Sequence, residues 1–188
     1  KTSVRHFLAQ AMNASGGSCA VIGTLGIGNP NALEKATHTT PDVITVHQNL
    51  QRLSTRGGRC VAMEVSSHAL DQQRVAGVAF DVAILTNLTR DHLDYHSDMD
   101  EYFAAKMRLF DEVVNDDATI VVWTGNSEWT ARALEHAQKR NLRVFTVGEQ
   151  GETIRLLTHT PTQLGQALEI EYDGQSRTIN LPLIGAYQ

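Results

Sequence analysis

Residues 80–114 read FDVAILTNLTRDHLDYHSDMDEYFAAKMRLFDEVV, and this stretch decides the fold class. The apolar, β-branched run at 80–86 predicts a buried strand, and helical periodicity returns at 99–114. A strand, a polar loop and a helix in this order form the unit from which parallel α/β sheets are built. Open sheets of this kind bind ligands at the carboxyl ends of their strands. The polar loop between the strand and the helix is therefore the first candidate site.

The same alternation extends on both sides of this stretch. Further strands are predicted at 19–23, 59–65, 119–123 and 143–147, and further helices at 2–13 and 128–140. Another helix is expected to have Thr40 as its N-cap and Pro41 at its first position. After Gly148 the pattern becomes alternating, with strands predicted at 153–158, 167–172 and 177–181. We expect an α/β fold with a mostly parallel sheet flanked by helices and a small antiparallel β appendix near the C-terminus.

Length and composition exclude several classes of protein. A chain of 188 residues fits one domain, and with a net charge of -5 and no basic cluster, nucleic acid is not expected as a partner. The longest apolar runs are far shorter than the roughly 20 residues that span a bilayer, so no membrane association is expected. Cys19 and Cys60 lie in apolar, strand-like runs, which indicates reduced, buried thiols in a cytoplasmic protein.

Lys106 is the most informative single residue. At 3.6 residues per turn, the apolar neighbours within about 60° of it on the helix are Met99, Tyr102, Phe103, Leu109, Phe110 and Val113. Burial favours a neutral amine and lowers the pKa of a lysine, which makes its nitrogen available as a nucleophile or for modification. The alternative is a lysine whose stem packs while its ammonium reaches water.

Two polar groups follow predicted strands. The loop after residue 86 carries Asp91, His92, Asp94 and His96, which could bind a metal but more commonly serve loop hydrogen bonds. A zinc pair of His92 and His96 would require a helix, which the turn signals disfavour. Glu64 interrupts the apolar run near the end of the strand predicted at 59–65, and Ser66, Ser67 and His68 follow it. A carboxylate beside hydroxyls suits magnesium and nucleotide phosphate. A hydrolase dyad of Ser66 and His68 is disfavoured because no nucleophile elbow surrounds them.

Taken together, four strings resemble the central domain of the Mur ligases in order and spacing. They are EVSSHAL at 64–70, QQR at 72–74, TNLTRDHLDYH at 86–96 and AAK at 104–106. The resemblance covers 1–188 and is closest to the members that add the third amino acid to UDP-N-acetylmuramoyl-L-alanyl-D-glutamate. It implies a P-loop-type sheet and an ATP- and Mg²⁺-dependent amide ligase of peptidoglycan synthesis, active in cell wall biogenesis, cell shape and cell division.

The resemblance also implies roles for individual residues. Lys1 and Thr2 would end the phosphate loop, with Lys1 on the phosphates and the Thr2 hydroxyl near magnesium. Glu64 and His92 would be magnesium ligands, and Lys106 would be carbamylated and help to hold a second magnesium. The residues implied to contact the UDP-muramoyl dipeptide are Thr39, Thr40, Ser66, Gln72, Arg74 and, as a weaker candidate, Asn87. For Thr40 this role stands beside its predicted N-cap role.

Further expectations follow from comparing the whole chain with this family. The chain is expected to be truncated at both ends and to lack the UDP-binding and amino-acid-binding domains, so alone it should be inactive. The resemblance further implies that the complete enzyme adds either diaminopimelate or lysine and that it is a monomer. The turn at 123–127, WTGNS, departs from the family's usual Asn-Ala-Asp-Asp, which leaves its contacts open. The alternatives are a ligase like folylpolyglutamate synthase, or a non-catalytic domain that retains the fold.

Overall fold

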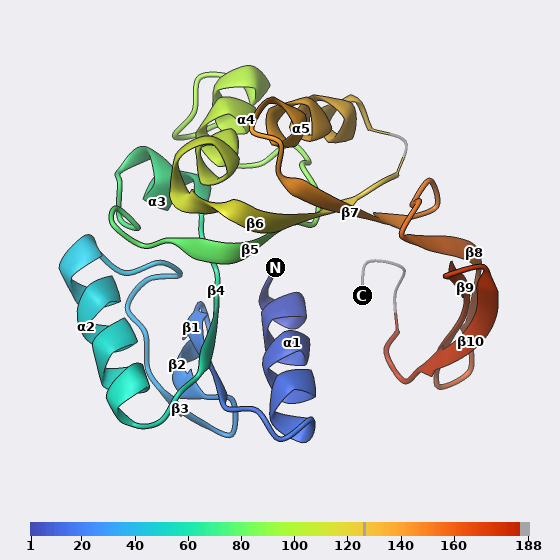
Figure 1. Ribbon diagram of the computed structural model, residues 1–188, viewed down its shortest axis with the longest axis horizontal. Coiled ribbons are helices and arrows are strands. Elements are labelled where there is room, and N and C mark those ends of the chain that lie inside the picture. Colours follow the sequence, from blue (N-terminus) through green and yellow to red (C-terminus); the bar gives the residue numbers. More distant parts are fainter. Residues whose placement is uncertain (126, 185–188) are drawn as a thin grey trace. The chain divides into compact units, whose positions relative to one another are not determined.

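The structure is a computed structural model that describes residues 1–125 and 127–184 (Figure 1). The chain packs into two compact units, neither of which is continuous in sequence. Unit 1 comprises Lys1–Val78 and His92–Leu109, and unit 2 comprises Ala79–Asp91 with the described part of Phe110–Gln188. Both units contain helices and strands, so the predicted α/β class is confirmed.

Unit 1 contains a four-stranded sheet in the order β3-β2-β1-β4. Its elements in chain order are α1 (Thr2–Ala14), β1 (Cys19–Gly23), β2 (Gly26–Asn29), β3 (Ala32–Glu34), α2 (Val43–Thr55), β4 (Cys60–Met63), α3 (Ser67–Asp71) and α4 (Met99–Arg108). Strands β1 and β4 are parallel, whereas β2 and β3 add to the other side of β1 as antiparallel strands. The sequence prediction included β1 and β4 but not β2, β3 or the short helix α3.

The alternation of side chains along β1 divides the core of unit 1 into two layers. Ala20 and Ile22 pack with Leu53 of α2 on one face, and Cys19 and Val21 pack with Ala9 of α1 on the other. Figure 1 shows α1 and α2 on opposite sides of this sheet. Because both faces are covered, β1 is buried along its whole length. This packing fixes the position of the strand's carboxyl end.

Helix α2 begins two residues later than predicted, at Val43. Its N-cap is Asp42, whose Oδ1 accepts a hydrogen bond of 3.0 Å from the Thr45 backbone N–H. Asp42 is the better cap because its second oxygen also accepts from the Thr45 hydroxyl, at 2.6 Å. The predicted N-cap role of Thr40 is therefore wrong. Thr40 is buried and hydrogen-bonds elsewhere.

Unit 2 contains a six-stranded sheet in the order β10-β9-β8-β7-β6-β5. Its elements are β5 (Phe80–Leu85), β6 (Val114–Trp123), α5 (Glu128–Lys139), β7 (Arg143–Gly148), β8 (Ile154–Thr162), β9 (Gly165–Tyr172) and β10 (Gln175–Leu181). Strands β5 to β8 are parallel, and β8, β9 and β10 are antiparallel. The predicted antiparallel appendix is thus confirmed. Asn126, in the turn that departs from the family pattern, lies outside the described residues.

The predicted helix over 99–114 ends earlier than expected. After Arg108 the chain forms a π-helical turn at Leu109–Val113, and Val114 already pairs with Phe80 as the first residue of β6. Arg140 Nη1 donates to the carbonyl oxygens of Phe110 at 2.6 Å and Val114 at 3.3 Å. These bonds satisfy acceptors that a continuing α-helix would otherwise have paired. In the part of the chain that the structure describes, no helix is long and apolar enough to cross a membrane.

Candidate functional site

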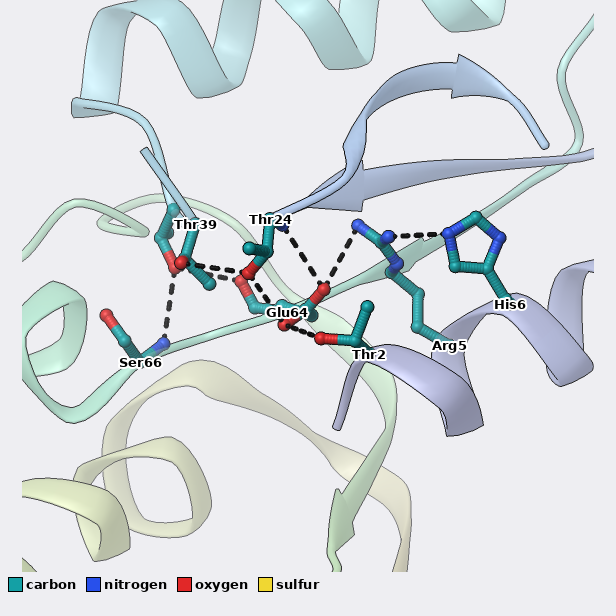
Figure 2. A network of polar contacts seen from close by, with 8 residues as sticks. Thr2, Arg5, His6, Thr24, Thr39, Glu64 and Ser66 are labelled. Atoms are coloured by element: carbon teal, nitrogen blue, oxygen red, sulfur yellow. Dashed lines mark hydrogen bonds and ion pairs between the residues drawn. The ribbon is translucent and has the colours of Figure 1, made fainter. Parts of the chain in front are cut away.

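The carboxylate of Glu64 forms the centre of a polar network at the end of β4 (Figure 2). The Glu64 residue is 4% exposed, so both carboxylate oxygens must be satisfied inside the protein. Oε2 accepts hydrogen bonds from the Thr2 hydroxyl at 3.0 Å and the Thr24 hydroxyl at 3.3 Å. Oε1 accepts from the Thr24 backbone N–H at 3.3 Å and lies 3.2 Å from Arg5 Nη1.

The parallel pairing of β1 with β4 brings these groups together. Ile22 lies opposite Met63, so the next residues on each strand, Gly23 and Glu64, emerge at the same edge of the sheet. The Glu64 backbone N–H extends the pairing by donating to the Ile22 carbonyl at 2.9 Å. Gly23 leaves the necessary space, because a Cβ there would lie 2.0 Å from Arg5 Nη1 and 2.4 Å from Glu64 Oε1. The carboxyl ends of both strands thus contribute to one site, as expected for an α/β sheet.

Arg5 is the cation of this site and was not predicted from the sequence. It is 3% exposed, and burial lowers its pKa while the neighbouring Glu64 raises it. Burial also lowers the pKa of His6, and the adjacent Arg5 lowers it further. Arg5 and Ala9 are four residues apart on the buried face of α1, so helical spacing could have revealed an arginine facing the core. Thr24 was also missed, because only the β1–β4 register places it beside Glu64.

Thr39 and Thr40 connect this centre to the segment that follows β4. The Thr40 hydroxyl donates to the Glu64 carbonyl at 2.8 Å and accepts from the Ser66 backbone N–H at 3.2 Å. The hydroxyls of Thr39 and Thr24 share a hydrogen bond of 3.0 Å. The side chain of Ser66 caps α3 by accepting from the Ala69 backbone N–H at 3.1 Å. Thr39, Thr40 and Ser66 therefore lie together near Glu64, and their contact with substrate stays a prediction.

Three histidines and two tyrosines from α3, α4 and the loop before α4 gather in unit 1. The His68 ring centre lies 5.1 Å from that of His92 and 5.6 Å from that of His96. His96 is buried and is hydrogen-bonded to the Ser67 hydroxyl at 3.0 Å. Burial lowers the pKa of His68, and the nearby His92 and His96 lower it further. The loop at His92 and His96 is not helical, as the turn signals indicated.

His92 has a left-handed backbone conformation, with φ at 55°. Residues other than glycine rarely adopt this conformation, and such strain is common at functional sites. The tight turn places the His92 ring 5.7 Å from the Tyr102 ring of α4. The loop thus holds His92 against the helix that carries Lys106.

Lys106 is half-buried on α4, and its Nζ lies 4.6 Å from the centre of the Tyr102 ring. This contact confirms that Lys106 lies on the aromatic side of the helix.

All but one of the predicted site residues belong to unit 1. Those in unit 1 are Lys1, Thr2, Thr39, Thr40, Glu64, Ser66, Gln72, Arg74, His92 and Lys106. Asn87 belongs to unit 2, where its Oδ1 accepts a hydrogen bond of 3.5 Å from the Thr86 hydroxyl. The suggested contact of Asn87 with substrate remains a prediction.

The donor atoms around Glu64 fit a hard cation. A carboxylate oxygen and the hydroxyl oxygens of Thr2 and Thr24 are the ligand types that magnesium prefers. Within residues 1–125 and 127–184, no three histidine, cysteine, aspartate or glutamate side chains form a metal-binding group. A magnesium ion at Glu64 would therefore share its coordination with hydroxyls, water and phosphate oxygens, which is common for this metal.

These features define an α/β protein with a polar site where the carboxyl ends of parallel strands meet the N-terminus of a helix. Comparison with known proteins identifies the family. The model of the Mur ligase middle domain matches residues 1–188, and the chain belongs to this family.

Several similar relatives share one name, UDP-N-acetylmuramoyl-L-alanyl-D-glutamate--2,6-diaminopimelate ligase. The protein of this name from Zymomonas mobilis is 40% identical over 188 residues, and that from Alkalilimnicola ehrlichii is 57% identical over 110 residues, or 58% of this chain. The chain covers 38% and 22% of these two relatives, respectively.

Solved structures agree with this assignment. A structure of a ligase with the same name matches with a TM-score of 0.87 at 26% identity, covering 100% of this chain and 38% of that one. A folylpolyglutamate synthase from Mycobacterium tuberculosis matches with a TM-score of 0.73, covering 99% of this chain and 49% of that one. At 14% identity, the second match shows a shared fold alone.

Proposed function

We propose that this chain is the central, nucleotide-binding part of a longer ATP-dependent amide ligase. The ligase adds the third amino acid, diaminopimelate or lysine, to UDP-N-acetylmuramoyl-L-alanyl-D-glutamate during peptidoglycan precursor synthesis in the cytoplasm. The observation that carries this proposal is the buried Glu64 carboxylate with the Thr2 and Thr24 hydroxyls at the start of α1. Family membership and the shared name of the relatives support it.

Lys1 and Thr2 bind the phosphates of ATP in this proposal. The N-terminus of α1 carries a partial positive charge, which favours an anion. Glu64, His92 and the Thr2 hydroxyl hold magnesium, whose chemistry is to neutralise phosphate charge. Lys106, as its carbamate, supplies a second carboxylate-like ligand. Its place on α4 beside Tyr102 leaves it half-buried, which suits modification of the neutral amine.

Thr39, Thr40, Ser66, Gln72 and Arg74 hold the UDP-muramoyl dipeptide in this proposal. Arg74 Nη1 donates to the Thr40 carbonyl at 3.0 Å, which brings the guanidinium to the network around Glu64. The D-glutamyl carboxylate takes the γ-phosphoryl group and releases ADP. The incoming amine then attacks the acyl phosphate, forms the amide and releases phosphate and a proton. Protein cations, including Arg74, reduce the repulsion between the two reacting anions.

Two other functions deserve a direct comparison. A folate-specific ligase is suggested by the shared fold of folylpolyglutamate synthase, but that match carries no information on substrate at 14% identity. A non-catalytic domain would have no need to retain Glu64, His92 and Lys106 in one unit.

ADP release by the complete ligase separates these functions. We expect turnover that requires UDP-N-acetylmuramoyl-L-alanyl-D-glutamate, magnesium and either diaminopimelate or lysine, and none with a folate and glutamate. Turnover with the folate pair alone would establish the second candidate. Nucleotide binding without turnover on any amino acid would favour the non-catalytic one.

A further inference from the structure

A continuous chain of side-chain hydrogen bonds connects Asp71 to Arg74. Tyr95 donates its hydroxyl to Asp71 Oδ2 at 2.6 Å, and Gln72 Nε2 donates to the Tyr95 hydroxyl oxygen at 3.2 Å. Gln72 Oε1 in turn accepts from Arg74 Nε at 3.0 Å and from Arg74 Nη2 at 2.6 Å. All four residues belong to unit 1. The Asp71 and Tyr95 side chains had no assigned role in the site described above.

The donor and acceptor properties of these side chains determine the direction of each hydrogen bond in the series. An ionised aspartate only accepts hydrogen bonds, so the single hydroxyl proton of Tyr95 points to Asp71. The Tyr95 oxygen then presents only lone pairs to Gln72, which must turn its NH₂ toward the tyrosine. The amide oxygen of Gln72 consequently faces Arg74. Asp71 thus determines the orientation of the Gln72 side chain, although none of these hydrogen bonds joins the two side chains directly.

Both ends of the chain are anchored. Arg108 Nη1 donates to the Asp71 backbone carbonyl at 3.2 Å and lies 3.9 Å from Asp71 Oδ1. At the other end, Arg74 Nη1 donates to the Thr40 carbonyl at 3.0 Å. The Tyr95 ring packs 4.0 Å from the His68 ring, measured between centres, so its hydroxyl is held in place by the ring as well.

The guanidinium of Arg74 retains N–H groups that can donate hydrogen bonds to a ligand. Arginine has five N–H groups, and within the described residues Arg74 uses its Nε–H and one N–H on each terminal nitrogen. One N–H therefore remains on Nη1 and one on Nη2. These two donors are available to an anionic group such as a carboxylate or phosphate.

We infer that Asp71 and Tyr95 are positioning residues, which hold Gln72 and Arg74 in the orientation that receives an anionic group of the substrate. The inference rests on the proposed function, because it takes the UDP-muramoyl dipeptide as that substrate. Asp71 and Tyr95 act through Gln72 and Arg74, so their loss should change substrate affinity more than the chemical step.

Steady-state kinetics of the complete ligase test this inference. Tyr95→Phe keeps the ring on His68 and removes only the hydroxyl. We expect its KM for UDP-N-acetylmuramoyl-L-alanyl-D-glutamate to rise about fivefold, the size of one hydrogen bond, with kcat and the KM for ATP little changed. Asp71→Asn should act in the same way, and the double variant should be no worse than Tyr95→Phe because both changes break one chain. Tyr172→Phe, at an exposed tyrosine of β9 in unit 2, is the matched control.

The source of the anionic group can be found with UDP-N-acetylmuramoyl-L-alanine as an inhibitor, since it keeps the diphosphate and lacks the D-glutamyl group. Weaker inhibition of Tyr95→Phe than of wild type supports positioning toward the diphosphate side. Equal inhibition, together with the raised KM, supports positioning toward the D-glutamyl carboxylate.

Failure of this inference differs from failure of the proposed function. Wild-type ligase that does not use the UDP-muramoyl dipeptide refutes the proposed function. An active wild type with an unchanged KM in both Tyr95→Phe and Asp71→Asn overturns the positioning role. A lowered Tm together with equal increases in the KM for ATP and for the UDP substrate also overturns it, because Tyr95 would then only stabilise the fold. If Tyr95→Phe fails to fold, the KM values of Asp71→Asn for the UDP substrate and for ATP test the positioning role instead. The Asp71 side chain suits this test because it is 48% exposed.

Discussion

Arg5 Nη1 lies 3.2 Å from Glu64 Oε1, and each side chain is 3% exposed, so a full ion pair is buried at the site. Removing one partner leaves an uncompensated buried charge. We expect Arg5→Gln and Glu64→Gln each to lower the free energy of unfolding by about 3 kcal/mol. Urea denaturation measures both values. The double variant should lose less than the sum of the two, and strictly additive losses would contradict a coupled pair.

Replacing His92 tests metal binding while the buried ion pair of Arg5 and Glu64 stays in place. In the complete ligase, His92→Ala should lower turnover at limiting magnesium by on the order of 10–100-fold, as loss of a group that holds a metal does. The Tm of His92→Ala should change little, because alanine at this position adopts the same left-handed backbone conformation as histidine. Near-native turnover at limiting magnesium would show that His92 is not a ligand.

Gly23→Ala should destabilise the chain through a direct clash. The new methyl group would lie 2.0 Å from Arg5 Nη1 and force the buried pair apart. A loss of about 1–3 kcal/mol is expected for such overpacking. Gly57→Ala is the comparison, because nothing lies within 4 Å of a Cβ there and only the φ of +84° is unfavourable. Thermal unfolding of both variants should show the larger loss at Gly23. The reverse order would mean that the site relaxes around the methyl group.

Lys106 variants distinguish a carbamate from a lysine that merely packs. Lys106→Met keeps the apolar stem on Tyr102, so the fold should persist while turnover of the complete ligase is lost. Lys106→Glu restores a carboxylate on a shorter stem and should recover part of the activity that Lys106→Ala abolishes. Turnover with and without bicarbonate, together with Tm, measures these effects. Full activity of Lys106→Met would eliminate the carbamate.

Cys19 should resist alkylation at neutral pH although its partner thiol reacts. Burial and the hydrogen bond from its thiol to Cys60 Sγ at 3.1 Å raise the pKa of Cys19 to about 12. The folded thiol therefore stays protonated at pH 8, whereas the half-buried Cys60 is open to reagent. Iodoacetamide labelling followed by mass spectrometry should find Cys60 modified first and Cys19 only in urea. Equal labelling of both native thiols would contradict the assigned environment of Cys19.

The raised pKa of Cys19 also makes the free energy of unfolding depend on pH. Below the ordinary value of 9.0 both the folded and the unfolded thiol of Cys19 are protonated, so this contribution is fully present. Between that value and about 12 the unfolded thiol ionises while the folded one does not, and stability is lost. The effect should disappear in Cys19→Ser.

Strong local patterns made most of the fold predictable. Strand β1 was predicted with the bounds that it has, because both of its faces are apolar and covered by helices. The hairpin of β2 and β3 was missed. Strand β2 is Gly-Ile-Gly-Asn, and Gly26 and Gly28 have positive φ values, so pairing with β1 and not local propensity makes it a strand. Tertiary pairing of this kind leaves little signal in the sequence.

The candidate site was predictable where a residue interrupts a pattern. Glu64 breaks an apolar run and Lys106 breaks an apolar helix face, so each was noticed. Arg5 was missed although its four-residue spacing from Ala9 places it on the buried face of α1, because only the register of β1 with β4 identifies Glu64 as its partner. The competition between Thr40 and Asp42 for the cap of α2 was decided by the Thr45 hydroxyl, a contact that capping preferences alone do not include.

The interleaving of the two units has a consequence for synthesis of the chain on a ribosome. Unit 1 needs residues on both sides of the segment Ala79–Asp91, which belongs to unit 2. Glu64 emerges well before Lys106, so a nascent chain that ends before α4 has a carboxylate centre without its lysine. No single proteolytic cut separates the two units into continuous pieces, and neither can be expressed alone as one uninterrupted segment. Assembly of the site is therefore tied to a late, long-range closure of the polypeptide, which is intrinsically slower than local folding.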